Sequence, residues 1–142
     1  MFNFTVDKIE KSFEQSLDSL QLSYVDLIQV HDVEFSASLD QIIHKVIPTL
    51  QKFKKSGRAK YIGITGYHLG VLKRIVQLCP PGSIDTVLSY GRCNLINQGT
   101  NFIFRSRAFM RKGSLGVTFF PVRISVRPQI LGNYYFFFVN YN

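Results

Sequence analysis

Residues 24–32 have the sequence Tyr-Val-Asp-Leu-Ile-Gln-Val-His-Asp, an apolar run that ends in two polar side chains. Near-continuous hydrophobicity with β-branched residues predicts a parallel strand that is covered on both faces. Such strands occur in α/β proteins, where a helix connects each strand to the next. This stretch therefore sets the fold class, and helices should lie on either side of it.

Helical patterns flank the predicted strand. Residues 5–22 place apolar side chains at steps of three and four and predict an amphipathic helix, with Thr5 as its N-cap. The capping-box pattern of residues 38–41 predicts the start of a second helix, which Pro48 should kink. Lys54 and Lys55 followed by Ser56-Gly57 predict its end.

The pattern then repeats along the chain. Residues 60–65 predict a strand, residues 69–78 a helix and residues 84–90 a third strand. Alternating helices and short strands indicate βαβ units with a parallel sheet, which is either doubly wound or part of a barrel. No glycine-rich phosphate-binding pattern follows a strand, which weakens the doubly wound dinucleotide-binding alternative.

Seven of the eight units of net positive charge belong to the last third of the chain. Residues 1–91 hold ten Lys or Arg and nine Asp or Glu, whereas residues 92–142 hold seven Lys or Arg and no acidic residue. Aromatic and basic residues in that last third follow neither a helical nor a strand period, although residues 119–126 and 134–140 are candidate strands. We therefore expect a domain of residues 1–91 and an aberrant or poorly ordered basic tail of residues 92–142.

Composition narrows the class of protein. With 142 residues, 46% of them hydrophobic, the chain has the size of one ordinary domain. Cys79 and Cys93 are too few for a disulfide framework and lack metal-ligand spacing. Residues 1–9 show no signal peptide, and the apolar run Tyr134–Val139 is too short to span a bilayer. We expect a soluble, cytoplasmic protein without a metal site.

Polar or aromatic residues follow each of the three predicted strands. They are His31-Asp32, Thr65-Gly66-Tyr67 and Ser89-Tyr90. In a β/α barrel the active site lies at the C-terminal ends of the strands, so these residues are the candidate site. A helix-capping or core histidine is the alternative for His31.

Two of these segments resemble the aldo-keto reductase family. Residues 24–32 are similar to its fourth strand, and Lys60-Tyr61-Ile62-Gly63-Ile64-Thr65-Gly66 is similar to its fifth. Residues 39–43, 64–67 and 80–82 resemble most the L-galactose and D-arabinose dehydrogenase branch. The resemblance runs from about Phe2 to Tyr90. It implies an incomplete (β/α)8 TIM barrel of about three βα units, from helix 3 to strand 6 of the family, with an irregular C-terminal segment.

The resemblance also implies a function and roles for the site residues. Family members transfer hydride between NAD or NADP and a small-molecule carbonyl or sugar. His31 matches the histidine that orients the substrate oxygen, where an imidazole N–H stabilises charge that develops in the transition state. Thr65 matches the residue that helps hold the nicotinamide carboxamide. Gly66 stands where the family usually has Asn, and Tyr90 is expected near the cofactor.

The sequence also departs from the family. The family's catalytic Asp, Tyr and Lys precede the segment with which this sequence begins, and its cofactor phosphate and adenosine contacts come from later units without a clear match here. We therefore expect a family member that is inactive as it stands. One alternative is a nucleic-acid-binding module that uses the basic aromatic tail, although its arginines (Arg105, Arg107, Arg111, Arg123 and Arg127) fit no recognised motif. The other is a non-catalytic fragment that docks on a full-length relative.

Overall fold

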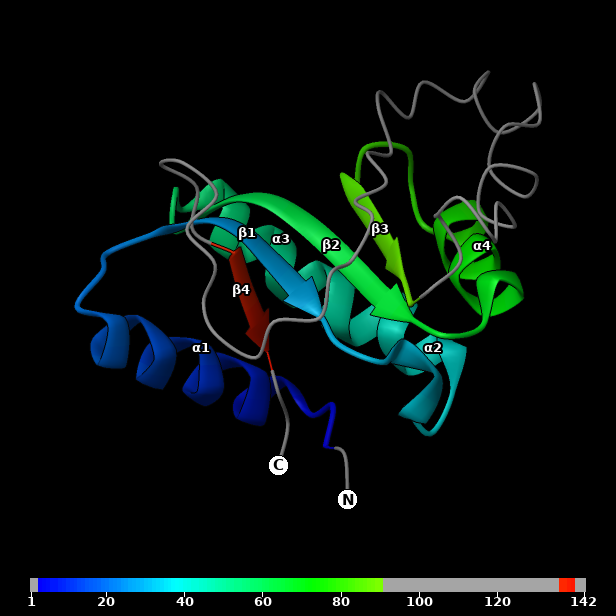
Figure 1. Cartoon of the computed structure of the whole chain (residues 1–142), viewed down its shortest axis with the longest axis horizontal. Helices are drawn as coiled ribbons and strands as arrows, with labels where there is room; N and C mark the ends of the chain where they lie inside the picture. The colour runs from blue at the N-terminus through cyan, green and yellow to red at the C-terminus, as the bar shows by residue number, and fades with distance from the viewer. Residues whose placement is uncertain (1–2, 91–135, 140–142) are drawn as a thin grey trace.

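The computed structural model describes residues 3–90 and 136–139 as an α/β structure with a four-stranded parallel sheet (Figure 1). The sheet order is β3-β2-β1-β4. The elements are α1 (Val6–Leu20), β1 (Val25–Val30), η1 (Val33–Phe35), α2 (Leu39–Gln41), η2 (Ile42–Val46), α3 (Ile47–Lys55), β2 (Ala59–Gly66), α4 (Leu69–Leu78), β3 (Thr86–Ser89) and β4 (Phe136–Val139). The predicted alternation of helices and strands is confirmed, as is the parallel sequential order of the first three strands.

The long helices share one face of this sheet. Their buried side chains form a single hydrophobic core with alternate residues of the strands: Ile9, Phe13 and Leu17 of α1, Leu50 and Phe53 of α3, Leu72 and Ile75 of α4, and Ile28, Val30, Ile62, Ile64 and Val87 of the sheet. The residues between these in the strands point to the opposite face. Helices outside a parallel sheet are the arrangement of a β/α barrel, and three consecutive units make this an incomplete one.

The second predicted helix forms in three connected pieces, α2, η2 and α3. Ser38 caps its start, since the Ser38 hydroxyl accepts a hydrogen bond from the Gln41 N–H at 3.2 Å. Pro48 lacks an N–H, and its ring crowds the carbonyl one turn before it. The chain responds with the π-helical segment η2, in which the N–H of Ile47 bonds to the carbonyl of Ile42. The predicted irregularity at Pro48 therefore takes the form of a wider turn.

Helix ends follow the predicted stop and start signals in part. Thr5 occupies the N-cap position of α1, but its side chain makes no capping bond. The helix α3 ends at Lys55, and Gly57 follows with a φ of 75°, a backbone conformation that glycine adopts without steric cost.

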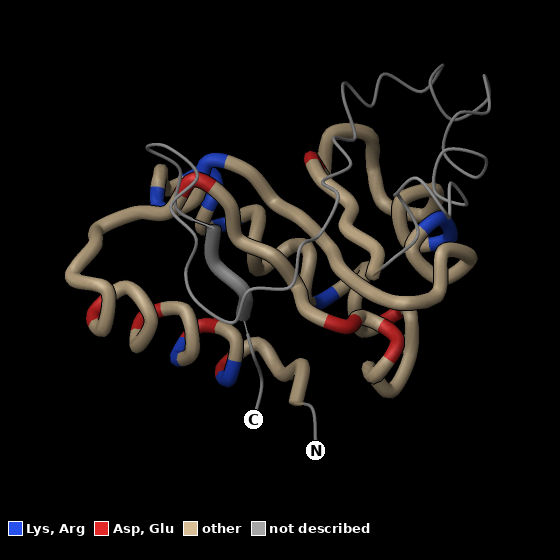
Figure 2. Tube along the Cα trace, in the orientation of Figure 1, with Lys and Arg blue, Asp and Glu red and all other residues tan. Residues whose placement is uncertain are grey.

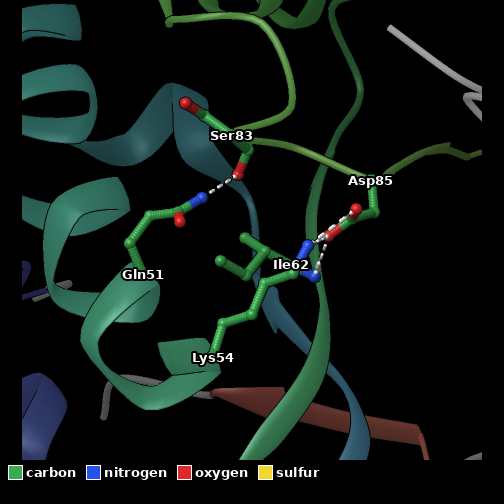
Figure 3. A network of polar contacts seen from close by, with 5 residues as sticks. All are labelled: Gln51, Lys54, Ile62, Ser83 and Asp85. Carbon is green, nitrogen blue, oxygen red and sulfur yellow. Dashed lines mark hydrogen bonds and ion pairs between the residues drawn. The ribbon is translucent and has the colours of Figure 1, made fainter. Parts of the chain in front are cut away.

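A polar network fixes the start of β3 against β2 and α3 (Figure 3). The Asp85 carboxylate accepts bonds from Lys54 Nζ at 2.8 and 2.6 Å and from the Ile62 N–H at 2.8 Å. The Asp85 N–H in turn donates to the Ile62 carbonyl at 2.7 Å, and Gln51 Nε2 donates to the Ser83 carbonyl at 2.9 Å. These bonds set where the third strand enters the sheet.

Only one part of the predicted basic tail belongs to the described residues. It is β4, which lies within the candidate strand 134–140 and pairs with β1 in parallel. The candidate strand 119–126 and the rest of residues 91–135 lie outside the described residues. The domain boundary at residue 91 stays a prediction.

We predict that Asp85→Ala lowers the free energy of unfolding by about 1–3 kcal/mol, because the Ile62 N–H and Lys54 lose their common acceptor. Chemical denaturation with urea measures this. Asp40→Ala is the matched control, since the Asp40 side chain is 86% exposed and lies 4.0 Å from His44, and it should be neutral. Equal effects of the two substitutions would contradict the role of the network.

Cys79 gives a second prediction. It is buried at the end of α4, and burial raises the pKa of its thiol from 9.0 to about 11. Its thiolate fraction at pH 8 is then about 100-fold below that of an ordinary thiol. In a Cys93→Ser variant, iodoacetamide should therefore label native Cys79 far more slowly than the urea-unfolded chain. Because the folded pKa is raised, this thiol should also cost stability as the pH rises from about 9 to about 11.

Candidate functional site

The candidate site lies at one rim of the sheet, where β1, β2 and β3 end. His31 follows β1, Thr65 and Gly66 end β2, and Tyr90 follows β3. Because the strands are parallel and Val30 pairs with Ile64 and Gly66 with Ser89, all four residues come to the same rim. Their predicted position is thus confirmed, and their roles stay predictions.

Asp32 connects the first two strand ends. Its backbone has a φ of 50°, in the left-handed region that non-glycine residues seldom occupy. In this conformation the Asp32 N–H donates to Thr65 Oγ1 at 3.0 Å, and the Asp32 Oδ2 atom lies 3.2 Å from His31 Nδ1. The carboxylate therefore lies directly beside the imidazole ring, where it can interact with it electrostatically.

Acidic groups gather where the chain leaves β1 (Figure 2). Burial raises the pKa of the Asp32 carboxyl; the neighbouring His31 opposes this shift, and the nearby Glu34 charge adds to it. A negative rim favours ligands that present hydrogen-bond donors over anionic ones.

Glu34 occupies the space beside Gly66. Its Oε1 atom accepts a hydrogen bond from the Tyr67 N–H at 2.6 Å. A Cβ atom at position 66 would lie 2.3 Å from Glu34 Oε2, closer than such atoms approach one another. Glycine at this position therefore admits the Glu34 carboxylate, which ties η1 to the loop after β2.

Two tyrosines stand at the outer part of the rim. The rings of Tyr67 and Tyr90 have centroids 5.4 Å apart and planes tilted by 48°. Both residues are about half exposed, at 47% and 49%. Amphipathic rings that are exposed beside polar groups are typical of small-molecule sites.

The candidate residues differ in how much surface they offer to a ligand. The His31 side chain is 36% exposed, whereas Thr65 is only 2% exposed. The Thr65 hydroxyl accepts the Asp32 N–H and keeps its own proton as a donor. The structure thus brings His31 and Thr65 together through Asp32, and Gly66 and Tyr90 together through Tyr67.

Sequence reasoning missed Glu34. It lies in η1, beyond the strand end, where no periodicity marks it. The available signal was the glycine at position 66, since a missing side chain at a strand end leaves room for another group.

Two further kinds of site were sought in the described residues. In residues 3–90 and 136–139, no group of three or more His, Cys, Asp or Glu side chains is arranged to hold a metal ion. Over the same residues, no helix has the length and apolar character needed to cross a membrane.

Comparison with known proteins shows which family the chain belongs to. The family model for the Aldo/keto reductase family matches residues 1–110. L-galactose dehydrogenase of Arabidopsis thaliana is 46% identical over 89 residues, which are 63% of this chain and 28% of that protein. D-arabinose 1-dehydrogenase of Saccharomyces cerevisiae is 35% identical over 112 residues, which are 75% of this chain and 32% of that protein. The chain thus spans about a third or less of these two relatives.

Solved structures agree on the fold. An aldo-keto reductase structure from Pseudomonas aeruginosa has a TM-score of 0.60 at 21% identity and covers 84% of this chain and 42% of that one. A structure described as a 2,5-diketo-D-gluconic acid reductase B has a TM-score of 0.59 at 20% identity and covers 82% of this chain and 37% of that one. At these identities the likeness concerns the fold, which is the β/α barrel in part.

The Gly66 and Glu34 contact gives a testable coupling. Gly66→Ala should displace the Glu34 carboxylate and break its bond to the Tyr67 N–H. The same substitution in a Glu34→Ala background should cost little, so the double-mutant cycle should show a coupling of about 1 kcal/mol in the free energy of unfolding. Gly70→Ala is the control, because a Cβ there meets nothing within 4 Å. Additive effects at positions 34 and 66 would show that the two do not interact.

Proposed function

Because the chain belongs to the aldo/keto reductase family, we propose that it carries part of the active site of an NAD(P)-dependent sugar dehydrogenase of the L-galactose dehydrogenase type. The placement of His31 is the observation that supports this most. It follows a central parallel strand, at the rim where β/α barrels carry their chemistry, and the Asp32 carboxylate lies 3.2 Å from its ring. The substrate class would be a small carbonyl compound or sugar.

His31 would act on the oxygen of the reacting carbonyl or alcohol. A donor N–H at that oxygen stabilises the negative charge that develops on it as hydride is transferred at the neighbouring carbon. This hydrogen bond is strongest in the transition state. Asp32 would position the ring, because it contacts His31 and is itself anchored through its N–H to Thr65. The histidine would then approach the substrate with little loss of side-chain freedom.

In this proposal the described residues would hold the nicotinamide end of NAD or NADP. Bound there, the cofactor would supply the hydride acceptor or donor. The Thr65 hydroxyl has a donor proton for a carboxamide oxygen, and Tyr90 lies at the next strand end with an exposed ring. At Gly66 the cofactor would meet the Glu34 carboxylate, which fills the space that a side chain would take. We propose these three positions as the cofactor contacts of this chain.

We further propose that the isolated chain does not catalyse hydride transfer by itself. Protonation of an alkoxide, or removal of the alcohol proton, needs a tuned acid or base beside the orienting histidine, and such a group contributes about 10²–10⁴-fold. Among residues 3–90, no lysine and tyrosine pair lies at the rim with His31 to take this role: Tyr67 and Tyr90 are there, but the lysines lie on helices and at the opposite ends of the strands. A cytoplasmic location and a boundary at residue 91 between the barrel part and the basic tail complete the proposal.

The nucleic-acid alternative rests on arginines that lie outside the described residues, at positions 105, 107, 111, 123 and 127. Within residues 3–90 the charges are mixed in sign along α1 and acidic near the rim (Figure 2). A nucleic-acid interface would need a continuous basic face. No feature of the described residues favours this function over the first.

The first test uses the isolated chain. We expect no change in NADH or NADPH absorbance with L-galactose, D-arabinose or simple aldehydes, and no cofactor binding by fluorescence titration. Full-length Arabidopsis L-galactose dehydrogenase is the positive control. Turnover by the isolated chain that disappears in His31→Ala would overturn the expectation of inactivity.

The second test restores a complete barrel. Residues 2–90 of this chain replace the matching segment of Arabidopsis L-galactose dehydrogenase, with which the chain shares 46% identity over 89 residues. The chimera should oxidise L-galactose, and His31→Ala within it should lower kcat/KM by about 10²-fold or more. His44→Ala is the matched control, because that side chain is 73% exposed on η2 and is not one of the strand-end residues, and it should leave kcat/KM unchanged. A folded chimera in which both variants behave alike would refute the role of His31.

A further inference from the structure

The last strand of the chain lies on an unexpected side of the sheet. Along the sequence β4 comes after β3, yet the sheet order β3-β2-β1-β4 places it beside β1 (Figure 1). It pairs in parallel, with Leu27 opposite Phe136 and Val30 opposite Val139. The order of the strands along the sequence and their order in the sheet therefore differ for β4.

A β/α barrel would place its strands differently. Each parallel strand follows its neighbour with a right-handed crossover, so a strand that continues the series after β3 would lie beside β3. The position beside β1 belongs to a strand that precedes α1. In the described residues no strand precedes α1, which begins at Val6. Among the described residues, β4 therefore occupies the position beside β1.

The helix α1 packs beside the position that β4 occupies. It lies along β4 on one side and against α3 on the other, where the Phe13 and Phe53 rings are 4.4 Å apart (Figure 1). In a βαβ unit the helix covers the two strands that it connects. With β4 present, β4, α1 and β1 have the arrangement of such a unit, although β4 comes from the far end of the sequence.

The edge of β1 that faces away from β2 has the character of an edge that pairs with another strand. All six of its residues are buried, which is the pattern of a central strand rather than of an edge. An uncovered edge of this kind presents unpaired N–H and C=O groups to any other strand and leads to association. Phe136-Phe137-Phe138-Val139 is an uncharged run of strong strand formers, which suits it to this pairing.

We propose that the β1 edge beneath α1 is a strand-binding site that β4 occupies in cis, and that β4 thereby blocks strand addition by a second copy of this chain. The occupant is residues 136–139, and the partner that they exclude is another copy with its own β1 edge exposed. This proposal rests on the pairing alone and is independent of the enzymatic one. It also means that β4 must leave before a barrel strand of any other polypeptide can pair with β1.

The test compares two truncations of the full chain. One ends at Tyr135 and removes β4; the matched control ends at Asn140 and removes only the two residues after it. Amide hydrogen exchange of residues 25–30 should become at least about 10-fold faster in the first variant alone, whereas residues 86–89 keep their protection. Light scattering after size exclusion should show a monomer for the control and self-association for the variant that lacks β4.

Proline substitutions in the full chain supply a second comparison. Successive N–H groups of a strand point to opposite edges, so one of Phe137 and Phe138 donates toward β1 and the other away from it. Phe137→Pro and Phe138→Pro should therefore differ, and only one should raise the exchange of residues 25–30 and promote association. Equal, negligible effects would overturn the pairing.

Hydrogen exchange of the unaltered chain tests the β1–β4 pairing even if a variant fails to fold. Residues 136–139 should themselves be protected from exchange in the full chain, to within about 10-fold of residues 86–89. Exchange of residues 136–139 at the rate of an unstructured peptide would overturn the proposal. So would a monomeric variant ending at Tyr135 in which residues 25–30 exchange at the original rate.

Discussion

The parallel pairing of β1 with β2 is the constraint on which the rest of the structure depends. Val25 lies opposite Ala59 and Val30 opposite Ile64, so the two strands start together and β2 continues two residues past the end of β1. This register allows the Asp32 N–H to reach Thr65 Oγ1, because Asp32 lies two residues and Thr65 one residue beyond the last pair of the two strands. A shift by one residue would turn Thr65 to the helix-covered face and leave His31 without its neighbours. The rim is thus a property of the sheet rather than of its loops.

The two ends of the strands carry different tasks. At the C-terminal end, a left-handed Asp32, a close approach at Gly66 and half-exposed tyrosines leave polar groups at the surface. At the opposite end, Arg58 bonds to Glu14 with both guanidinium nitrogens and lies over the Phe13 and Phe53 rings, and this bond lowers the pKa of the Glu14 carboxyl. The Asp85 network likewise satisfies its polar groups internally. Barrel proteins divide stability and chemistry between their two faces in this way.

The spacing of apolar residues, together with the Gly, Pro and capping residues at element ends, was enough to predict the first three strands, the helices and the rim. These features follow from local hydrophobic spacing and from the geometry of parallel strands. The resemblance to the family supplied the choice between a barrel and a doubly wound sheet. Three features were beyond reach. Glu34 is positioned by a contact with Gly66 more than thirty residues away. The irregularity at Pro48 was expected, but whether the helix would bend or widen depends on packing. The placement of β4 beside β1 is a long-range choice that a run of phenylalanines does not encode.

The π-helical segment before Pro48 has a consequence for the phase of the helix that follows. A π turn accommodates one residue more than an α turn, and each residue of an α-helix advances the side-chain direction by about 100°. Everything after η2 is therefore rotated relative to the face that α2 begins. That rotation directs Gln51 and Lys54 toward the segment that leads into β3, while Leu50 and Phe53 stay in the core. Removal of a single residue from η2 would restore a regular helix and turn both polar side chains away from Ser83 and Asp85. The widened turn thus rotates the later part of the helix, so that its apolar side chains pack in the core while its polar side chains bond to the segment that leads into β3.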